Sequence, residues 1–531
     1  MPLSLSGEGG NRGLLGEAFD LAFAFVANGY REAGIDMVYQ NLRDFLRFLD
    51  RTGQLVRIQR PVSVDLEMAE ITDRTMKLPG GGPALLFERP VLMDGTESPI
   101  PVAINIFGSW RRMAAALGVD DVEVHARRIA ELVKPEIPKG LWGKMAMLPK
   151  LAELTKVPPR PYKGAPPCQQ VVLREGEFDL TRFPVLKTWP HDGGPFITLP
   201  MVVTSDPETG IQNIGMYRMQ VFGPTSTGMH WQRHKGGAAH YRAWKRTRGG
   251  RMPVVVAIGG DPATMYTPSA PLPPGIDEYL FGGFLRRDPV RTCKAITADL
   301  TIPAEAEIVL EGYVDTDEEL RIEGPFGDHT GFYTLEDPYP TFHVTTVTLR
   351  EEPIYPATLV GRPPVEDVYL GGATERIFLP LARLTMPEIV DYHMPPEGVF
   401  HNLVFVSIRK EYPGHAYKVM NGLWGMGLMS LAKVIVVVDE GIDVRNTQEA
   451  WWYALGNIDP ERDVKFTKGP VDDLDHAAQN PSFGSKMGID GTRKWPEEGF
   501  TRRWPDMIEM DADVKAHVDG IWARLGIKPI D

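Results

Sequence analysis

Two short apolar runs in the last third of the chain constrain its fold most strongly. HNLVFVSIR (His401–Arg409) and KVIVVVDE (Lys433–Glu440) are each typical of a strand that is buried on both faces. A helical pattern at 414–431 separates them, and a longer one at 370–392 (LGGATERIFLPLARLTMPEIVDY) precedes them. This alternation of helices with buried strands predicts an α/β domain in the C-terminal part of the chain.

The middle of the chain has a different pattern, because its strand signals are separated by turns and by few helical segments. Gly, Pro and Asp turns bound the clearest strand signals, which are Leu199–Thr204, Gly215–Phe222, Pro253–Ile258, Ala306–Val314 and Phe342–Leu349. Such a series favours an antiparallel sheet or barrel. The Pro-rich segment VPPRPYKGAPP at 157–167 predicts a domain boundary before it.

The first part of the chain predicts an appendage followed by a small α/β domain. Leu42, Phe45, Leu46 and Leu49 form one apolar stripe of a helix that Gly53 ends. The patterns together divide the chain into an N-terminal extension with an amphipathic helix (1–35), an N-terminal α/β domain (36–156), a central β domain (157–350), a C-terminal α/β domain (351–500) and a C-terminal helical tail (501–531).

Composition excludes several classes of function. The formal net charge of −13 disfavours a general nucleic-acid surface. The two cysteines, Cys168 and Cys293, are far apart in sequence, which predicts no disulfide framework and fits a reducing compartment. No apolar run reaches the ~18–20 residues that span a bilayer, and the N-terminus lacks a secretory pattern. We expect a cytoplasmic protein, with peripheral membrane contact left open.

Asn213–Gly237 is the first of three segments whose polar groups are not demanded by composition alone. On a strand, Tyr217 and Arg218 would lie on opposite faces. His234 and Lys235 then precede two glycines, and such a turn suits an anion because it offers free backbone amides, a cation and no bulky side chains. A basic turn in solvent is the alternative.

Ser269–Tyr279 (SAPLPPGIDEY) is the second segment, a Pro-rich loop that ends in Asp277 and Glu278. Asp277 could simply cap the following helix. A metal role for Glu278 requires ligands from elsewhere, which Asn213 and His234 could supply. A set of Asn, His and Glu suits Mg²⁺ or Mn²⁺ better than structural zinc, which prefers thiolates.

EGPFGDHTG at 323–331 is the third segment. Glu323 and Asp328 lie in a loop whose glycines let the backbone bend and approach a ligand. Two carboxylates near an arginine can be held in different protonation states, so that one donates a proton while the other stays ionised. The alternative is an ordinary Asp–Gly turn. Lys418, on the helix predicted at 414–431, is either a solvated lysine or a phosphate ligand.

These segments resemble the UbiD family of decarboxylases, and the resemblance covers roughly Met37–Trp504. The shared blocks include NLRDFLRFLDRTGQLVRI, NIGMYRMQ, HKGGAAHY, EGPFGDHTGFY, GHAYKVMNGLW and GSKMGIDGTRKWP. The resemblance implies an α/β multidomain fold with an N-terminal α/β domain, a central split β-barrel related to flavin reductases, and a C-terminal α/β domain. It also implies a homodimer or homohexamer assembled through the C-terminal region. The extension at 1–35 has no counterpart in the family core.

The resemblance implies a cofactor, prenylated FMN, that a separate flavin prenyltransferase supplies. Its phosphate is held in this family through Mn²⁺ or Mg²⁺, often with K⁺ nearby, and the matching metal positions are Asn213, His234 and Glu278. The matching cofactor positions are Met216, Tyr217, Arg218, His230, Trp231, Gln232, Lys235, Gly236 and Lys418. His230 departs from quinone-pathway relatives, which can carry arginine there.

The resemblance also implies that Arg218, Glu323 and Asp328 are the catalytic trio of a reversible, non-oxidative decarboxylation through a covalent adduct with the cofactor, which provides the electron sink. Arg218 would orient the substrate carboxylate and hold Glu323 ionised. Asp328 would return a proton to the carbon that lost CO₂.

Shorter blocks of the sequence indicate the class of substrate. GDHTG and GRPP resemble decarboxylases of ubiquinone precursors, and LGGATERIFLPL and EGVFHN resemble those of a menaquinone route. We therefore expect a hydroxylated aryl carboxylic acid. Fold and cofactor do not fix the substrate, so another heteroaromatic or acrylic acid is one alternative, and a flavin-binding protein without turnover is another.

Overall fold

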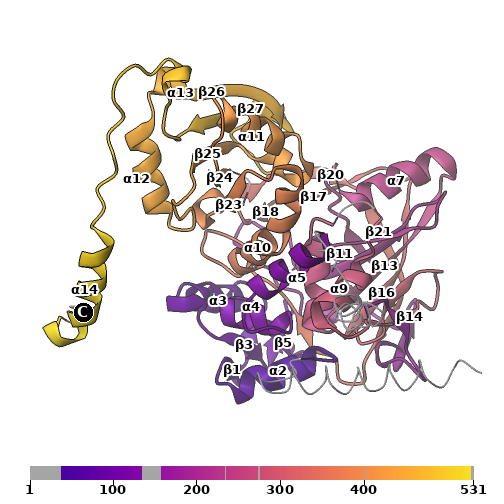
Figure 1. Ribbon diagram of the computed structural model, residues 1–531. Coiled ribbons are helices and arrows are strands. Elements are labelled where there is room, and N and C mark those ends of the chain that lie inside the picture. Colours follow the sequence, from indigo (N-terminus) through magenta and orange to yellow (C-terminus); the bar gives the residue numbers. More distant parts are fainter. Residues whose placement is uncertain (1–37, 134–156, 234, 273–274, 401, 528–531) are drawn as a thin grey trace, which may run out of the picture.

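A computed structural model describes residues 38–133, 157–233, 235–272, 275–400 and 402–527. The predicted N-terminal extension, with its helix, and the candidate metal ligand His234 lie outside these residues. The described chain is a mixed α/β protein built around three main sheets (Figure 1). Within the described ranges, no helix is both long enough and apolar enough to cross a membrane.

The N-terminal unit is a four-stranded sheet in the order β1–β3–β5–β22 with helices packed on it. Its first helix begins at Asn41, whose side chain accepts a hydrogen bond from the Asp44 amide at 3.0 Å, and the helix buries the predicted apolar stripe. The elements are α2 (Leu42–Arg51), β1 (Leu55–Ile58), β2 (Val62–Ser63), α3 (Glu67–Met76), β3 (Ala84–Phe87), β4 (Pro90–Val91), β5 (Val102–Ile104), α4 (Trp110–Ala116) and α5 (Glu123–Val133).

The fourth strand of this sheet comes from far along the chain. β22 (Tyr355–Pro356) pairs in parallel with β5, so residues that the sequence pattern assigned to the C-terminal domain complete the N-terminal sheet. A two-residue strand carries too little periodic signal to be recognised from sequence.

The central unit is a curled, nine-stranded sheet in the order β10–β9–β13–β16–β21–β12–β11–β8, with β7 also pairing with β21. All these pairings are antiparallel, as the strand signals predicted. The strands are β7 (Val171–Arg174), β8 (Phe196–Ile197), β9 (Pro200–Ser205), β10 (Gln212–Gly215), β11 (Met219–Gly223), β12 (Ser226–Gly228), β13 (Arg251–Ile258), β16 (Ile308–Asp315) and β21 (Thr341–Leu349).

One expected strand of this sheet is interrupted at the point that matters most for the site. The sequence predicted a continuous strand over Gly215–Phe222, but β10 ends at Gly215 and β11 begins at Met219. β10 lies at one end of the strand order and β11 lies near the other end. The three residues Met216–Arg218 therefore connect the two sides of the open barrel, and no neighbouring strand pairs with them.

Shorter elements surround the barrel and carry several of the candidate residues. α7 follows the turn that was predicted to bind an anion, and α9 follows the Pro-rich segment at 269–279. The short β17–β20 and β18–β19 pairs hold the loop at 323–331 that contains Glu323 and Asp328. These elements are α7 (Gly236–Thr247), α8 (Pro262–Tyr266), α9 (Glu278–Arg286), β17 (Arg321–Glu323), β18 (Phe326–Gly327), β19 (Tyr333–Thr334) and β20 (Asp337–Tyr339); β6 (Arg160–Pro161), β14 (Arg291–Lys294) and β15 (Thr301–Pro303) form a small separate sheet.

The C-terminal unit is a five-stranded sheet in the order β23–β24–β25–β27–β26. Strands β24, β25 and β27 run parallel, and both faces of the sheet are covered by apolar clusters. Its elements are α10 (Asp367–Thr385), β23 (Ile389–His393), β24 (Leu403–Ile408), α11 (His415–Trp424), β25 (Val434–Asp439), α12 (Thr447–Asn457), α13 (Pro460–Asp463), β26 (Val464–Pro470) and β27 (Phe483–Asp490). This confirms the predicted α/β unit.

The helix predicted at 370–392 is shorter than expected. α10 ends at Thr385, and the residues IVDYH form strand β23 instead. Pro387 disfavours helical backbone at the residue before it, and the β-branched pair Ile389 and Val390 favours a strand. α10 lies where the three units meet, because it packs on α5, on β23 and, through Phe378, on Phe281 of α9 (Figure 1).

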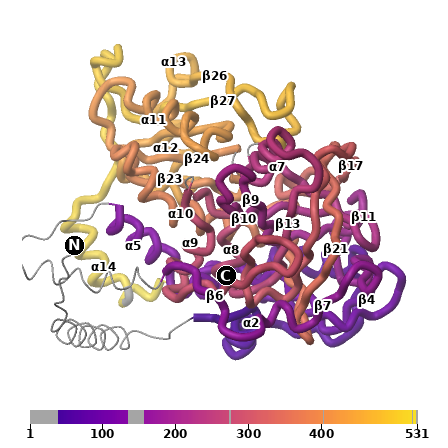
Figure 2. The backbone as a smooth tube through the Cα atoms, turned by 90° about the vertical axis from the view of Figure 1, so that its right-hand side faces the viewer, coloured from indigo at the N-terminus to yellow at the C-terminus, as the bar shows by residue number. Residues whose placement is uncertain are grey.

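The C-terminal tail runs down the outside of the molecule in both views (Figures 1 and 2). α14 (Ala512–Trp522) buries none of its side chains, although Val514 and Trp522 are apolar. The predicted helix at 514–525 is thus confirmed, with its last residues in a 3₁₀ turn (Ala523–Leu525).

Candidate active site

Arg218 lies between the two predicted acids and forms the centre of the site. Its Nη1 makes an ion pair with Oδ2 of Asp328, and its Nε lies 3.4 Å from Oε1 of Glu323. All three side chains are nearly inaccessible to solvent, with exposed fractions of 11% for Arg218, 1% for Glu323 and 8% for Asp328. The structure therefore brings the predicted trio together, from segments more than one hundred residues apart.

Local packing positions the two acids. Gln220 of β11 accepts a hydrogen bond from the Gly324 amide at 2.8 Å, and Asp192 accepts one from the Gly327 amide at 2.8 Å. These bonds fix the loop between Glu323 and Asp328 to the barrel. Gly228 gives Glu323 its space, because a Cβ at that position would lie 2.3 Å from Glu323 Oε2.

Each acid has its own set of partners. Glu323 Oε1 lies 2.9 Å from His230 Nδ1, while its Oε2 is buried without a hydrogen-bond partner among the described residues. Asp328 Oδ2 also accepts a hydrogen bond from Thr334 Oγ1 at 3.0 Å. A buried carboxylate oxygen without a donor is costly, so Glu323 is placed to accept a hydrogen bond from a bound molecule.

The charges in this cluster shift its pKa values in defined directions. Burial alone would raise the pKa of Asp328, but the Arg218 guanidinium and the adjoining His329 outweigh it and hold the pKa well below its ordinary value. Burial, with the charge of Arg218, lowers the pKa of His230 despite its bond to Glu323. Arg218 also lies 4.7 Å from the Phe326 ring centroid, a cation–π contact that keeps it in place.

A second cluster adjoins the first through Tyr217, the neighbour of Arg218. The Gly237 amide donates to the Tyr217 hydroxyl at 3.1 Å, which brings the start of α7 against this segment. Asn213 packs on the same helix end, since a Cβ on Gly236 would lie 2.0 Å from Asn213 Oδ1. Asn213, Tyr217, Gly236 and Gly237 thus converge, and all but Gly237 were predicted from the sequence.

Glu278 belongs to this second cluster. It is the first residue of α9, with Asp277 capping the helix by accepting a hydrogen bond from the Leu280 amide at 2.9 Å. Burial raises the pKa of Glu278 to about 7, and Glu278 also accepts a backbone hydrogen bond from Ile214, which follows Asn213 in the chain. Asp277 therefore has the capping role that was its alternative interpretation.

The chemistry of these donors fits a hard cation. Glu278 is partly buried without a cationic partner in the described chain, and it accepts a hydrogen bond from Ile214, the residue after Asn213, whose side chain carries an amide oxygen. An amide oxygen and a carboxylate suit Mg²⁺ or Mn²⁺. No group of three His, Cys, Asp or Glu side chains is arranged for a metal among the described residues, which exclude His234.

The remaining predicted cofactor positions are divided between two places. Met216, Trp231 and Gln232 flank the two clusters, and Lys235 caps α7 with burial lowering its pKa while Asp472 and Asp473 raise it. Trp231 Nε1 is buried without a partner in the described chain. Lys418, on α11, forms an ion pair with Glu388, and its side chain is 45% exposed.

Several residues of the site were not singled out from the sequence. His329 lies 3.1 Å from Asp328 Oδ1 through its Nδ1, and the Tyr339 ring lies 4.2 Å from the His230 ring. Thr334 and Asp192 complete the set. His329 adjoins a predicted acid in the GDHTG motif, which is a signal that the sequence contains. Thr334 and Tyr339 reach the site through the β18–β19 and β17–β20 pairings, and Asp192 reaches it by its hydrogen bond from the Gly327 amide.

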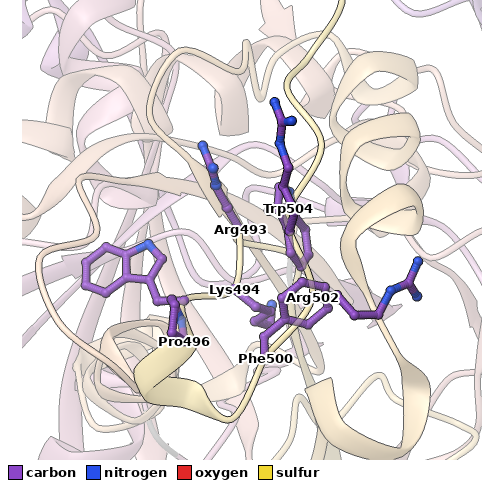
Figure 3. A pocket seen from close by; sticks show the side chains of 8 residues that line it. Arg493, Lys494, Pro496, Phe500, Arg502 and Trp504 are labelled. Carbon is purple, nitrogen blue, oxygen red and sulfur yellow. The ribbon is translucent and has the colours of Figure 1, made fainter.

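A separate cavity lies in the C-terminal unit (Figure 3). It has a volume of about 390 Å³ and is lined by Arg493, Lys494, Trp495, Pro496, Phe500, Arg502, Arg503 and Trp504. Lys494 does not supply free positive charge there, because its Nζ donates to the carbonyls of Asp490 and Thr492 at 2.8 and 2.6 Å. None of the trio lines this cavity.

Comparison with known proteins identifies the family. Sequence profiles of the 3-octaprenyl-4-hydroxybenzoate carboxy-lyase (UbiD) family match its N-terminal domain to residues 46–133, its Rift-related domain to 160–363 and its C-terminal domain to 368–491. An uncharacterised protein of Aquifex aeolicus is 51% identical over 491 residues, which is 92% of this chain and 99% of that protein. One of Archaeoglobus fulgidus is 50% identical over 490 residues, with the same coverage.

Solved structures agree with this assignment. Vanillic acid decarboxylase of Sedimentibacter hydroxybenzoicus, in a closed form, superposes with a TM-score of 0.80 at 26% identity, covering 92% of this chain and 100% of that chain. The UbiD-class enzyme HmfF of Pelotomaculum thermopropionicum, in complex with FMN, gives a TM-score of 0.71 at 28% identity, covering 88% and 97%. The chain is therefore a member of the UbiD family, and it is a carboxy-lyase.

Proposed function

We propose that this protein catalyses the non-oxidative, reversible decarboxylation of a hydroxylated aromatic carboxylic acid. The reaction, R–COO⁻ + H⁺ → R–H + CO₂, needs a cation for the carboxylate, a proton donor for the carbon and a sink for the electron pair. The observation that carries the proposal is the buried ion pair of Arg218 with Asp328, beside Glu323. A guanidinium binds a carboxylate in two-point geometry.

The cofactor that we propose is prenylated FMN, which supplies the electron sink when bound. HmfF is described in complex with FMN and, in an evolved dimeric form, with prenylated FMN. Among the described residues the buried Trp231 Nε1 has no hydrogen-bond partner, and it lies beside Gly237 at the start of α7, where a Cβ would lie 2.5 Å from it. A helix N-terminus of this kind favours a phosphate. A flavin prenyltransferase would supply the cofactor.

We propose that Asn213, Glu278 and His234 hold Mn²⁺ or Mg²⁺ near this phosphate, with K⁺ as a possible companion ion of the family type. Asn213 supports this because it packs on Gly236 at the start of α7, next to Lys235, and Glu278 supports it because it accepts a hydrogen bond from Ile214, which follows Asn213. The cation would neutralise the phosphate and the ionised Glu278 together. Lys235 would contribute a point charge to the same phosphate.

Arg218, Asp328 and Glu323 would each have a separate role at the substrate. Arg218 would exchange its bond with Asp328 for the substrate carboxylate and so orient it. Loss of that cation would raise the pKa of the buried Asp328 and allow it to carry the proton for the carbon. Glu323, held by His230, would keep Arg218 charged and aligned. The small volume left by Gly228 fixes Glu323 in this position.

The hydroxyaryl choice is supported by the structural neighbours. Vanillic acid, the substrate in the name of one of them, is a hydroxylated aryl acid. More specifically, we propose a role in ubiquinone or menaquinone synthesis. The alternative is that the substrate is another heteroaromatic or acrylic acid outside quinone synthesis, which a substrate screen would reveal.

We further propose self-association through the C-terminal region, as a homodimer or homohexamer. Exposed apolar side chains line the tail, among them Ile508 at 100%, Met510 at 60%, Trp522 at 53% and Ile527 at 59%. Such a row of apolar residues on a segment that buries nothing of its own is typical of an interaction surface.

The experiment that tests the function uses the full chain produced together with a flavin prenyltransferase. Release of CO₂ from vanillate, 3,4-dihydroxybenzoate, 4-hydroxybenzoate, furan-2,5-dicarboxylate and cinnamate would be measured, and the released cofactor identified by mass and absorbance. We expect turnover of at least one hydroxyaryl acid. Asp328→Asn should abolish turnover and leave the flavin bound. Flavin binding without CO₂ release from any acid would favour a non-catalytic flavin protein.

A further inference from the structure

His329 lies on the side of Asp328 that faces away from Arg218. Asp328 Oδ2 is occupied by Arg218 and Thr334, whereas Oδ1 accepts a hydrogen bond from the His329 backbone N–H at 2.8 Å and lies 3.1 Å from its Nδ1. Because a carboxylate only accepts hydrogen bonds, the imidazole carries a hydrogen on Nδ1. The two oxygens of Asp328 thus face two different cations.

The turn that carries both residues is rigid. The Asp328 amide donates to the Phe332 carbonyl at 3.1 Å, and the Gly331 amide donates to the Asp328 carbonyl at 2.9 Å. The turn also packs tightly on the segment before α10, since a Cβ on Gly331 would lie 3.2 Å from Arg362 Cα. The Asp328–His329 geometry is therefore built into the fold, and the His329 side chain is only 21% exposed.

His329 is surrounded by acids from three elements. Asp328 belongs to its own turn, Asp367 is the first residue of α10, and Asp472 lies in the loop after β26. Burial lowers the pKa of His329, but the hydrogen bond and charge of Asp328, followed by the charges of Asp367 and Asp472, raise it above its ordinary value overall. His329 thus stays protonated to a higher pH than a free imidazole does, whereas burial alone would favour its neutral form.

The pKa of Asp367 is shifted by burial and by the same neighbouring charges. Burial raises its pKa to about 7, the charge of His329 lowers it, and the charge of Asp328 raises it further. Asp367 is partly exposed, as is His329 itself, whereas Asp328 is buried. The remaining ring near His329 is that of Phe400, 5.8 Å away between centroids, and it carries no proton.

We propose that His329 supplies the proton that Asp328 delivers to the substrate carbon. This inference rests on the proposed function. When Arg218 binds the substrate carboxylate, the proton moves from His329 Nδ1 to Asp328 Oδ1, leaving a neutral imidazole and a carboxylic acid. Asp328 then rotates about Cβ–Cγ, gives this proton to the carbon as CO₂ leaves, and is again a carboxylate. Solvent, which reaches the 21% exposed His329 side chain, then returns one proton to the imidazole.

His329 acts through Asp328, so it is a positioning and proton-supplying residue and its removal should affect kcat and not KM. We expect His329→Gln to lower kcat by about a hundredfold, the lower end of the range in which a positioned acid or base acts. KM and flavin content should be unchanged. The matched control is His343→Gln. His343 lies on β21, and its substitution breaks a histidine–carboxylate contact of 2.6 Å with Glu318. That variant should keep wild-type turnover.

The pH profile separates proton supply from a structural role. His329 with a raised pKa is charged below that pKa, so wild-type kcat should fall as the pH rises through it. Asp367→Asn removes the charge that helps to raise this pKa, and should move the fall in kcat to lower pH. A wild-type pH profile in His329→Gln or in Asp367→Asn would overturn the proposal.

A second measurement needs no substrate and keeps this inference separate from the proposed function. The holoprotein labelled with ¹³C at histidine Cε1 is titrated by NMR, and the His329 signal is assigned by its loss in His329→Gln. We expect its pKa above the ordinary value of about 6.5, and lower in Asp367→Asn and in Asp328→Asn. Titration at or below the ordinary value in the wild type would refute the inference. Failure to turn over any acid, with the raised pKa present, would refute only the proposed function.

Discussion

Arg218 and Asp328, 110 positions apart in the chain, form a buried ion pair where the two sides of the open barrel are connected. Arg218 can occupy this place because β10 stops at Gly215 and β11 starts at Met219, which frees its backbone from the sheet. The interruption of the strand and the chemistry of the site are thus one structural feature.

Turnover should be sensitive to a single methyl group added beside Glu323. Gly228→Ala places a Cβ 2.3 Å from Glu323 Oε2 and must displace that carboxylate. We expect turnover to fall by about 10²-fold, as misplacement of a catalytic group by ~1 Å does. Circular dichroism should show an intact fold.

Gly223→Ala is the matched control for that substitution. Gly223 lies at the end of β11, in the same hairpin, and a Cβ there meets nothing within 4 Å. This variant should retain wild-type turnover. Equal losses in both variants would show that the hairpin, and not the position of Glu323, limits activity.

The start of α7 should control cofactor and metal binding. Gly236→Ala would place a Cβ 2.0 Å from Asn213 Oδ1, so Asn213 must move. We expect a loss of bound manganese and flavin, measured by elemental analysis and absorbance of the purified protein. Gly456→Ala on α12, where a Cβ meets nothing within 4 Å, should keep both and gain roughly 0.5–1 kcal/mol of stability, as helix propensity predicts.

The two cysteines should react at different rates. Cys168 is buried and Cys293 is partly exposed, although their sulfur atoms lie only 3.7 Å apart. Their hydrogen bond raises the pKa of the Cys168 thiol, together with burial, and lowers that of Cys293. A maleimide at neutral pH should therefore label Cys293 first, as peptide mass spectrometry can measure; faster labelling of Cys168 would contradict this geometry.

The C-terminal tail should be needed for assembly and not for the site. Truncation after Trp504 removes α14 and its exposed apolar residues. We expect a smaller particle by light scattering, with bound flavin retained. An unchanged particle size would place the contact between copies elsewhere.

The sequence predicted those parts of the fold whose apolar pattern is decided locally. β13 and β25 were predicted because apolar residues fill them on both faces. β23 was hidden in a helical pattern that Pro387 interrupts, and β22 is too short to have a pattern. Long-range pairing decided these elements, and a single sequence contains no record of it.

The functional site, too, could be predicted only in part from the sequence. Arg218, Glu323 and Asp328 were predicted through family resemblance, and the structure brings them together. The contact of Cys168 with Cys293 could not be predicted, because 125 positions separate them and only the packing of β14 against the 3₁₀ turn at Pro167–Gln169 joins them. Lys418 pairs with Glu388, a partner that spacing does not reveal.

The central claim is that Arg218 and Glu323 act as one unit on the substrate carboxylate. A double-mutant cycle of Arg218→Lys, Glu323→Gln and the double variant tests it most directly, with kcat measured as ¹³CO₂ release from a carboxyl-labelled substrate by the holoenzyme. Residues that act as a unit are strongly non-additive, so the double variant should be about as slow as the slower single variant. Losses that multiply, or a single variant with wild-type kcat, would contradict the account.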